Sequence, residues 1–137
     1  MEVTSLKNLE IKRMTTGKLP SLPFVRMKKE ILGESYDLSI SFVKKETIED
    51  LSQQFKGDKT HRNILSFPLD KTMPAHAGSG EIILNLQTIR SEAKNFDKKY
   101  LQYLGFLVIH GMLHLKGFTH GSKMESEEKR LVKIFNL

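Results

Sequence analysis

The chain has 137 residues, a length typical of one domain with its own buried core. Hydrophobic residues make up 39% and charged residues 28% of the sequence, a balance that excludes an intrinsically disordered chain. Cysteine is absent, which excludes a disulfide framework and a thiolate metal site. The net charge of +6 favours a polyanionic partner such as nucleic acid. No basic tail gathers that charge, so folding would have to assemble an RNA-binding surface.

The sequence predicts neither export nor membrane insertion. Its first residues read MEVTSLKNLEIKR, with charges where a signal peptide needs an apolar stretch. The longest run without Lys, Arg, Asp or Glu is Tyr100 to Leu115, shorter than the roughly 20 residues of a membrane span. We therefore expect a cytoplasmic protein that makes no membrane contact.

The first half of the chain alternates strand and helix signals. Residues 36 to 43 alternate apolar and polar side chains, as a half-buried strand does. Ile48, Leu51 and Phe55 recur at spacings of three and four, which indicates a helical face. The expected elements are a strand at Leu9 to Met14, a short amphipathic helix after Pro23 that ends near Leu32, a strand at Tyr36 to Val43 and a helix at Thr47 to Phe55.

The second half begins with a basic loop, KGDKTHR, and an extended segment, NILSFP. The later elements are expected as a loop over 69 to 80, a strand at Glu81 to Leu86, a helix at Thr88 to Asn95, a helix from about Asp97 through the histidines, and a last helix at about Lys123 to Phe135, with Leu131, Ile134 and Phe135 packed on the core. The sequence thus predicts one α+β domain over residues 1 to 137. About four strands in a small mixed sheet would pack with about five helices, and a metal site would lie on a central buried helix.

Three histidines lie within eleven residues, in the string HGMLHLKGFTH. His110 and His114 are four residues apart on an expected helix, so their side chains share one face. Gly117 suits the end of that helix, and the turn after it can bring His120 onto the same ion. Both helical rings can reach one ion at about 2.0 to 2.1 Å, the usual zinc–nitrogen distance. Three protein ligands leave a fourth position open, as in catalytic zinc sites.

Other interpretations of these histidines stay open. Ordinary core or surface histidines are common, but the helix LGFLVIHGMLHL is apolar on every side, and buried imidazoles need partners. Zinc proteases carry H-E-x-x-H, whereas Gly111 stands where their glutamate would be. A non-catalytic assembly factor with a structural zinc is the other alternative, with Glu81 or Glu125 closing the site. His61 and His76 fall in expected loops and are not expected to be ligands.

The same residues resemble a known family. HGMLHLKGFTH matches the H-G-x-L-H-L-x-G-[YF]-x-H signature of the bacterial YbeY endoribonucleases. KGDKTHRNILSFP resembles that family's basic loop and N-V-L-S-F-P segment, and GEIILN resembles its next strand. Met124 and Glu125 resemble the start of its last helix. The resemblance covers about residues 36 to 137 with the motifs in order.

What the resemblance implies is a single-strand-specific metallo-endoribonuclease that uses one zinc ion. Its expected roles are maturation of the 3′ end of small-subunit ribosomal RNA and ribosome quality control. The implied partners are single-stranded RNA, the ribosome or ribosomal proteins, and no DNA. Three histidines also bind other first-row divalent ions well, so the identity of the metal stays open.

The basic loop and the segment after it supply candidate RNA contacts. Lys56 is the candidate catalytic residue, a phosphate contact at a position where the family usually has arginine, and lysine lacks arginine's bidentate fork. Thr119 replaces an aspartate that the family often carries before the last histidine. The candidate RNA-binding residues are Lys59, Arg62, Asn63 and Ser66.

Overall fold

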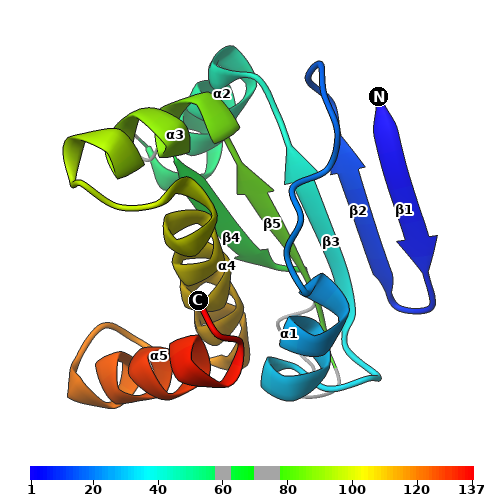
Figure 1. Cartoon of the computed structure of the whole chain (residues 1–137). Helices are drawn as coiled ribbons and strands as arrows, with labels where there is room; N and C mark the ends of the chain where they lie inside the picture. The colour runs from blue at the N-terminus through cyan, green and yellow to red at the C-terminus, as the bar shows by residue number, and fades with distance from the viewer. Residues whose placement is uncertain (58–62, 70–77) are drawn as a thin grey trace.

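The computed structural model describes residues 1–57, 63–69 and 78–137. Five strands and five helices lie in these ranges (Figure 1). The strands are β1 (Glu2–Leu6), β2 (Leu9–Arg13), β3 (Asp37–Phe42), β4 (Ile64–Pro68) and β5 (Ser79–Leu84). The helices are α1 (Phe24–Ile31), α2 (Lys45–Lys56), α3 (Leu86–Asn95), α4 (Tyr100–Lys116) and α5 (Ser122–Ile134).

The strands form one mixed sheet in the order β1-β2-β3-β5-β4. The three central strands β2, β3 and β5 are parallel, and the edge strands β1 and β4 are antiparallel to their neighbours. The α+β class and the small mixed sheet are therefore confirmed, with one strand more than the roughly four expected. The additional strand is β1, which is mostly exposed, so its sequence EVTSL has no apolar face to predict it.

The two faces of the sheet are covered unequally. On β5, Ile82 and Leu84 belong to the main core, whereas Ile83 packs with Ile48 in a smaller cluster on the α2 side. Helices α1, α3, α4 and α5 gather on the main-core face, where α4 crosses the sheet and contacts β4 (Figure 1). This arrangement holds α4 against the edge strand, and the histidines lie on that helix.

Helix α4 is buried along most of its length, as its continuous apolar sequence predicts. Leu104, Val108 and Met112 are fully buried, and full burial of such a side chain contributes about 1.5 to 3 kcal/mol. The helix ends at Gly117, whose φ of 112° is the left-handed conformation that glycine adopts at low cost. None of the described helices is long and apolar enough to span a membrane.

Several element boundaries differ from the predicted ones. Helix α2 begins at Lys45, two residues before the predicted start, because the pattern of apolar residues begins only at Ile48. Strand β5 ends at Leu84 because the side chain of Asn85 accepts a hydrogen bond from the Thr88 N–H and caps α3. The predicted burial of Ile134 was wrong, since its side chain is 39% exposed while α5 packs through its other face.

Candidate metal centre

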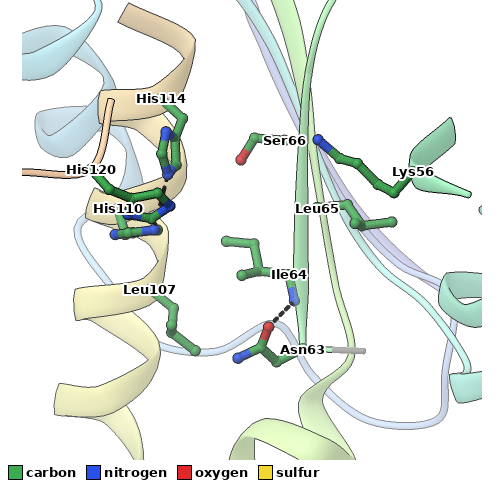
Figure 2. A pocket seen from close by; sticks show the side chains of 9 residues that line it. All are labelled: Lys56, Asn63, Ile64, Leu65, Ser66, Leu107, His110, His114 and His120. Carbon is green, nitrogen blue, oxygen red and sulfur yellow. Dashed lines mark hydrogen bonds between the residues drawn. The ribbon is translucent and has the colours of Figure 1, made fainter. Parts of the chain in front are cut away.

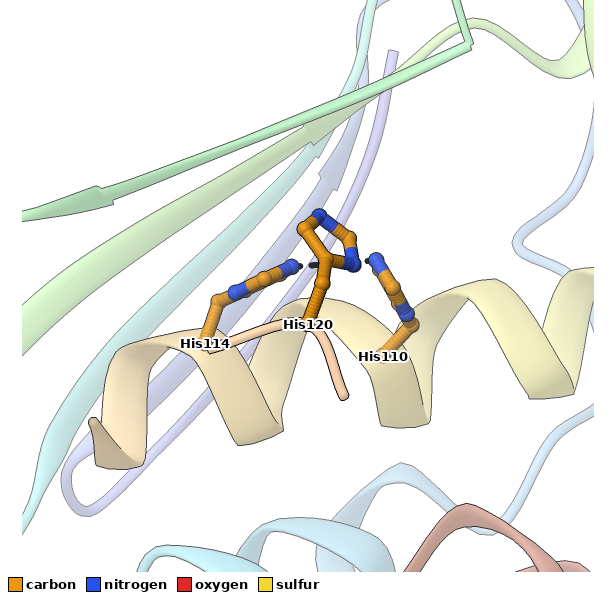
Figure 3. A group of neighbouring side chains, drawn as sticks. All are labelled: His110, His114 and His120. Atoms are coloured by element: carbon orange, nitrogen blue, oxygen red, sulfur yellow. Dashed lines mark hydrogen bonds between the residues drawn. The ribbon is translucent and has the colours of Figure 1, made fainter. Parts of the chain in front are cut away.

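Three imidazoles meet beside the C-terminal half of α4. His110 and His114 project from successive turns, and His120 comes from the loop after the helix (Figure 3). One ring nitrogen from each residue lies within 4.8 Å of the others. The ring centroids are 4.5 to 5.2 Å apart. The three histidines are thus positioned to bind one metal ion.

A short turn brings His120 back to the helix. The Gly117 N–H donates to the carbonyl of His114, and the Phe118 N–H donates to the carbonyl of Leu113, both at 3.0 Å. These bonds satisfy carbonyls that a helix end otherwise leaves unpaired. The turn therefore follows from the glycine and the backbone geometry at the helix end.

The contacts of His114 indicate which of its nitrogens carries a proton. Its Nδ1 lies 3.1 Å from the carbonyl oxygen of Phe118, and a carbonyl only accepts, so Nδ1 carries the hydrogen. The lone pair then sits on Nε2, which lies 3.0 Å from the Nε2 of His110. An imidazole whose outer N–H is held by a carbonyl is a common arrangement around metal ligands.

His110 has a carboxylate at the corresponding position. Its Nδ1 lies 3.6 Å from Oε2 of Glu128 on α5, a side chain that is nearly fully buried. That Nδ1 is buried and has no hydrogen-bond partner in the described structure. Burial raises the pKa of Glu128, and the nearby Glu125 raises it further. A small movement would let His110 donate to Glu128 and point its own Nε2 lone pair inward.

Glu128 was not identified from the sequence, although a signal for it exists. Met124, Glu128, Leu131 and Phe135 recur at spacings of four, three and four, and all four are buried. An acidic residue in the apolar stripe of a helix is costly unless it has a partner.

The donor set fits a first-row metal ion. Imidazole suits zinc, copper, iron and nickel, and a ligand imidazole must be neutral. Burial lowers the pKa of His110, and the positive charge of protonated His120 would lower it further. Burial also lowers the pKa of His114, with a further effect from His110. Both rings are therefore held in the form that binds metal.

The histidines border an open pocket between α4 and β4. Its volume is about 430 Å³, and Lys56, Asn63 and Ser66 line it together with the three imidazoles (Figure 2). Lys56 is the last residue of α2, and its side chain extends toward Ser66 on the opposite wall from the histidines. A ligand in this pocket would lie between the three imidazoles and one ammonium group.

Of the candidate RNA contacts, Asn63 already makes hydrogen bonds within the protein. Its side chain donates to Oε1 of Glu92 at 3.1 Å and accepts from the Ile64 N–H at 2.7 Å. Lys59 and Arg62 lie outside the described residues, as do His61 and His76.

Gly111 is explained by close packing between α4 and β4. A Cβ on this residue would lie 2.9 Å from Oγ of Ser66 and 3.0 Å from Cδ1 of Ile64, closer than normal contacts allow. A glutamate at position 111 would therefore require the side chains of Ser66 and Ile64 on the edge strand to shift. The packing that brings Ser66 to the pocket thus disfavours a side chain at the position where a zinc protease has its general base.

The carboxylates considered as a fourth ligand lie outside the histidine cluster. Glu81 borders a groove with Phe67 and Ile83, on the face of the sheet opposite α4. Glu125 lines a separate cavity that His110 and His120 also border. Neither carboxylate belongs to the group of converging donor atoms among the described residues. Thr119 is exposed, and the carboxylate that lies beside an imidazole is that of Glu128 on α5.

The fold and the site define an α+β protein with a three-histidine centre positioned to bind a metal ion. The family model described as Endoribonuclease YbeY matches residues 6–135. The chain belongs to the YbeY endoribonuclease family.

Individual relatives agree with this assignment. The endoribonuclease YbeY of Alkaliphilus metalliredigens is 27% identical over 129 residues, covering 90% of this chain and 83% of that protein. The endoribonuclease YbeY of Campylobacter jejuni strain 81-176 is 34% identical over 108 residues, covering 74% of this chain and 77% of that protein. A solution structure of a Thermotoga maritima protein has a TM-score of 0.61 at 23% identity, covers 91% of this chain and 87% of that one, and supports the fold.

Proposed function

We propose that this protein is a zinc-dependent endoribonuclease that cleaves single-stranded RNA. The observation that carries the proposal is the pocket itself, in which three imidazoles face a lysine across an open space of about 430 Å³. Membership of the YbeY family supports RNA as the substrate. The family resemblance further points to 3′-end maturation of small-subunit ribosomal RNA and to ribosome quality control in the cytoplasm.

The chain's own residues have defined parts in this function. His110, His114 and His120 would hold the ion. When bound, the ion would supply Lewis acidity and an ionised water near neutral pH. Lys56 would neutralise the negative charge that develops on a phosphodiester. Ser66 would offer a hydroxyl to the ribose or phosphate, and Lys59, Arg62 and Asn63 would extend the RNA contact.

The structural-zinc alternative predicts a closed coordination shell. The three histidines have no carboxylate within their cluster in the described ranges, and they border an open pocket. That arrangement favours a catalytic centre, since structural zinc sites usually have four protein ligands.

The test incubates the purified protein with single-stranded RNA, double-stranded RNA and casein, with and without a chelator, alongside His114→Ala. We expect cleavage of single-stranded RNA that both chelation and His114→Ala abolish. Cleavage that survives both treatments would come from a contaminating nuclease and would refute the proposal. Unfolding on chelation, with no RNA cut under any condition, would favour the structural-zinc alternative.

A further inference from the structure

A second pocket opens where the parallel strands end, away from the histidines. Its volume is about 570 Å³, and four cationic side chains line it together with a single carboxylate, Glu46. The cationic residues are Arg13, Lys44, Lys45 and Arg90. Arg13 ends β2, Lys44 follows β3, and Arg90 comes from α3 after β5, so the pocket lies at the carboxyl ends of the three parallel strands (Figure 1). Ligands bind preferentially at this edge of an open α/β sheet.

Most of this positive charge is not neutralised within the protein. In the ranges that the structure describes, none of the ion pairs involves Arg13, Lys44 or Arg90. The guanidinium carbon of Arg90 lies 4.0 Å from the centre of the Tyr100 ring. Burial raises the pKa of Tyr100, and the charges of Arg90 and Arg13 both oppose that rise. Two guanidiniums therefore act on one half-buried tyrosine.

Two lysines occupy helix positions that local energetics disfavour. Lys44 precedes the first residue of α2 and Lys45 is that residue, at the positive end of the helix dipole. The N-cap residue of α2 is Lys44, whose side chain makes no hydrogen bond to the helix and, as an ammonium group, cannot accept one from the first N–H groups. An anion in the pocket would satisfy both the lysines and these N–H groups.

A backbone hydrogen bond of Asn85 connects the linings of the two pockets. The Asn85 side chain borders the basic pocket and donates to the carbonyl of Val43 at 2.9 Å. The Asn85 N–H donates to the carbonyl of Asn63 at 2.9 Å, and Asn63 lines the histidine pocket. Asn63 and Asn85 therefore join the lining of the histidine pocket to the lining of the basic pocket.

We propose that the basic pocket binds backbone phosphates of the same RNA strand whose scissile phosphate lies at the histidines. This inference rests on the proposed RNA substrate. It assigns a phosphodiester as ligand because guanidinium groups, ammonium groups and the N–H groups at a helix N-terminus all favour phosphate oxygens. The contact reads no base, so it holds the strand without regard to sequence.

The test measures binding of a fluorescent single-stranded RNA by anisotropy, in chelator so that the strand is not cut. Lys44→Gln and Arg90→Gln each remove one charge from the pocket. The matched control, Lys94→Gln, removes one charge from an exposed position near the other end of α3. We expect each pocket variant to bind several-fold more weakly. The slope of log affinity against log salt should become shallower by about 0.7 for each RNA phosphate that the variant no longer neutralises. Lys94→Gln should match the parent.

Circular dichroism melts establish that the variants are folded. Equal weakening in all three variants would indicate a diffuse positive field and would refute the pocket. Inorganic phosphate could also displace the RNA completely when its concentration only equals the parent protein's dissociation constant for RNA. That result would identify a site for free phosphate instead. Parent protein that binds RNA with the expected variant pattern but never cuts it would refute the proposed catalysis and would still support binding of RNA phosphates in the basic pocket. If the parent protein cuts RNA while the pocket variants bind RNA normally, the proposed catalysis is supported and the phosphate-binding pocket is refuted. If the parent protein binds no RNA, both the proposed function and the phosphate-binding pocket are refuted.

Discussion

At the scale of single residues, the centre depends on what lies behind each imidazole. His114 has a carbonyl behind its Nδ1, and His110 has the Glu128 carboxylate. The carbonyl contact holds the orientation of the His114 ring, and a hydrogen bond from His110 to Glu128 would do the same for His110, with both lone pairs toward the place where an ion would bind. Across the pocket, Lys56 supplies the cation that faces them.

Glu128→Gln should weaken zinc binding by about 10- to 100-fold, the usual effect of losing a partner of a metal ligand. Competition against a chromophoric chelator measures the affinity. Glu127→Gln is the matched control, because Glu127 pairs with Arg130 on the surface. Equal affinities for the two variants would show that Glu128 does not support the centre.

Lys56→Ala should slow cleavage of single-stranded RNA by about tenfold or more, because a charge-assisted hydrogen bond contributes roughly 1.5 to 3 kcal/mol. Lys56→Arg should keep or increase the rate, since it restores the family's residue and its bidentate fork. Initial rates at saturating RNA measure the effect. If Lys56→Ala cuts as fast as the parent while Arg62→Ala is inactive, the phosphate contact belongs to Arg62.

At the scale of secondary-structure elements, the site depends on the distance between α4 and β4. The absence of a side chain at Gly111 lets Ser66 and Ile64 approach the helix. The same close approach forms one wall of the pocket and excludes a protease-like glutamate. The helix and the edge strand are thus coupled through a single small residue.

Gly111→Ala should destabilise the protein by about 1 to 3 kcal/mol, the usual cost of overpacking a close contact, despite alanine's higher helix propensity. Urea denaturation gives the free energy of unfolding. Gln102→Ala, on the exposed side of the same helix, should be neutral or stabilising. A Gly111→Ala protein as stable as the parent would mean that β4 moves freely away from α4.

At the scale of the whole molecule, folding partly buries two histidines, which favours their neutral form and so links stability to pH. The pKa of His110 and of His114 lies below the ordinary histidine value of 6.5. The unfolded chain therefore binds more protons than the folded protein just below pH 6.5. This contribution to stability is fully present above pH 6.5 and is lost as the pH falls through that value toward the folded pKa. The raised pKa of Glu128 makes stability change with pH in the opposite direction. Its contribution to stability is fully present below pH 4.5 and is lost as the pH rises above that value toward the folded pKa.

The metal-free protein should accordingly be less stable at pH 5.5 than at pH 7.5, and added zinc should increase the difference because ligand imidazoles must be neutral. Urea denaturation in chelator and in zinc at both pH values measures this. His110→Ala combined with His114→Ala should flatten the pH dependence. An unchanged dependence in that double variant would assign it to other groups.

Local patterns predicted much of the fold and the centre of the site. The i and i+4 spacing of His110 and His114, with the left-handed Gly117 after them, follows from helix geometry over a few residues, so the convergence with His120 was predictable. Strand β1 was not predictable, because its pairing with β2 depends on a neighbour and not on an apolar face of its own.

By itself the sequence determined the α+β class, the histidine cluster and the family. Only the tertiary structure decided that Glu128 stands behind His110, that Ser66 and Lys56 form the opposite wall, and that cations from β2, α2 and α3 share one pocket. The physical reason is the separation along the chain over which each kind of interaction acts. Helical periodicity and turn formation act over a few residues, whereas these contacts join elements far apart in the chain, and the packing of α5 and β4 against α4 places them together.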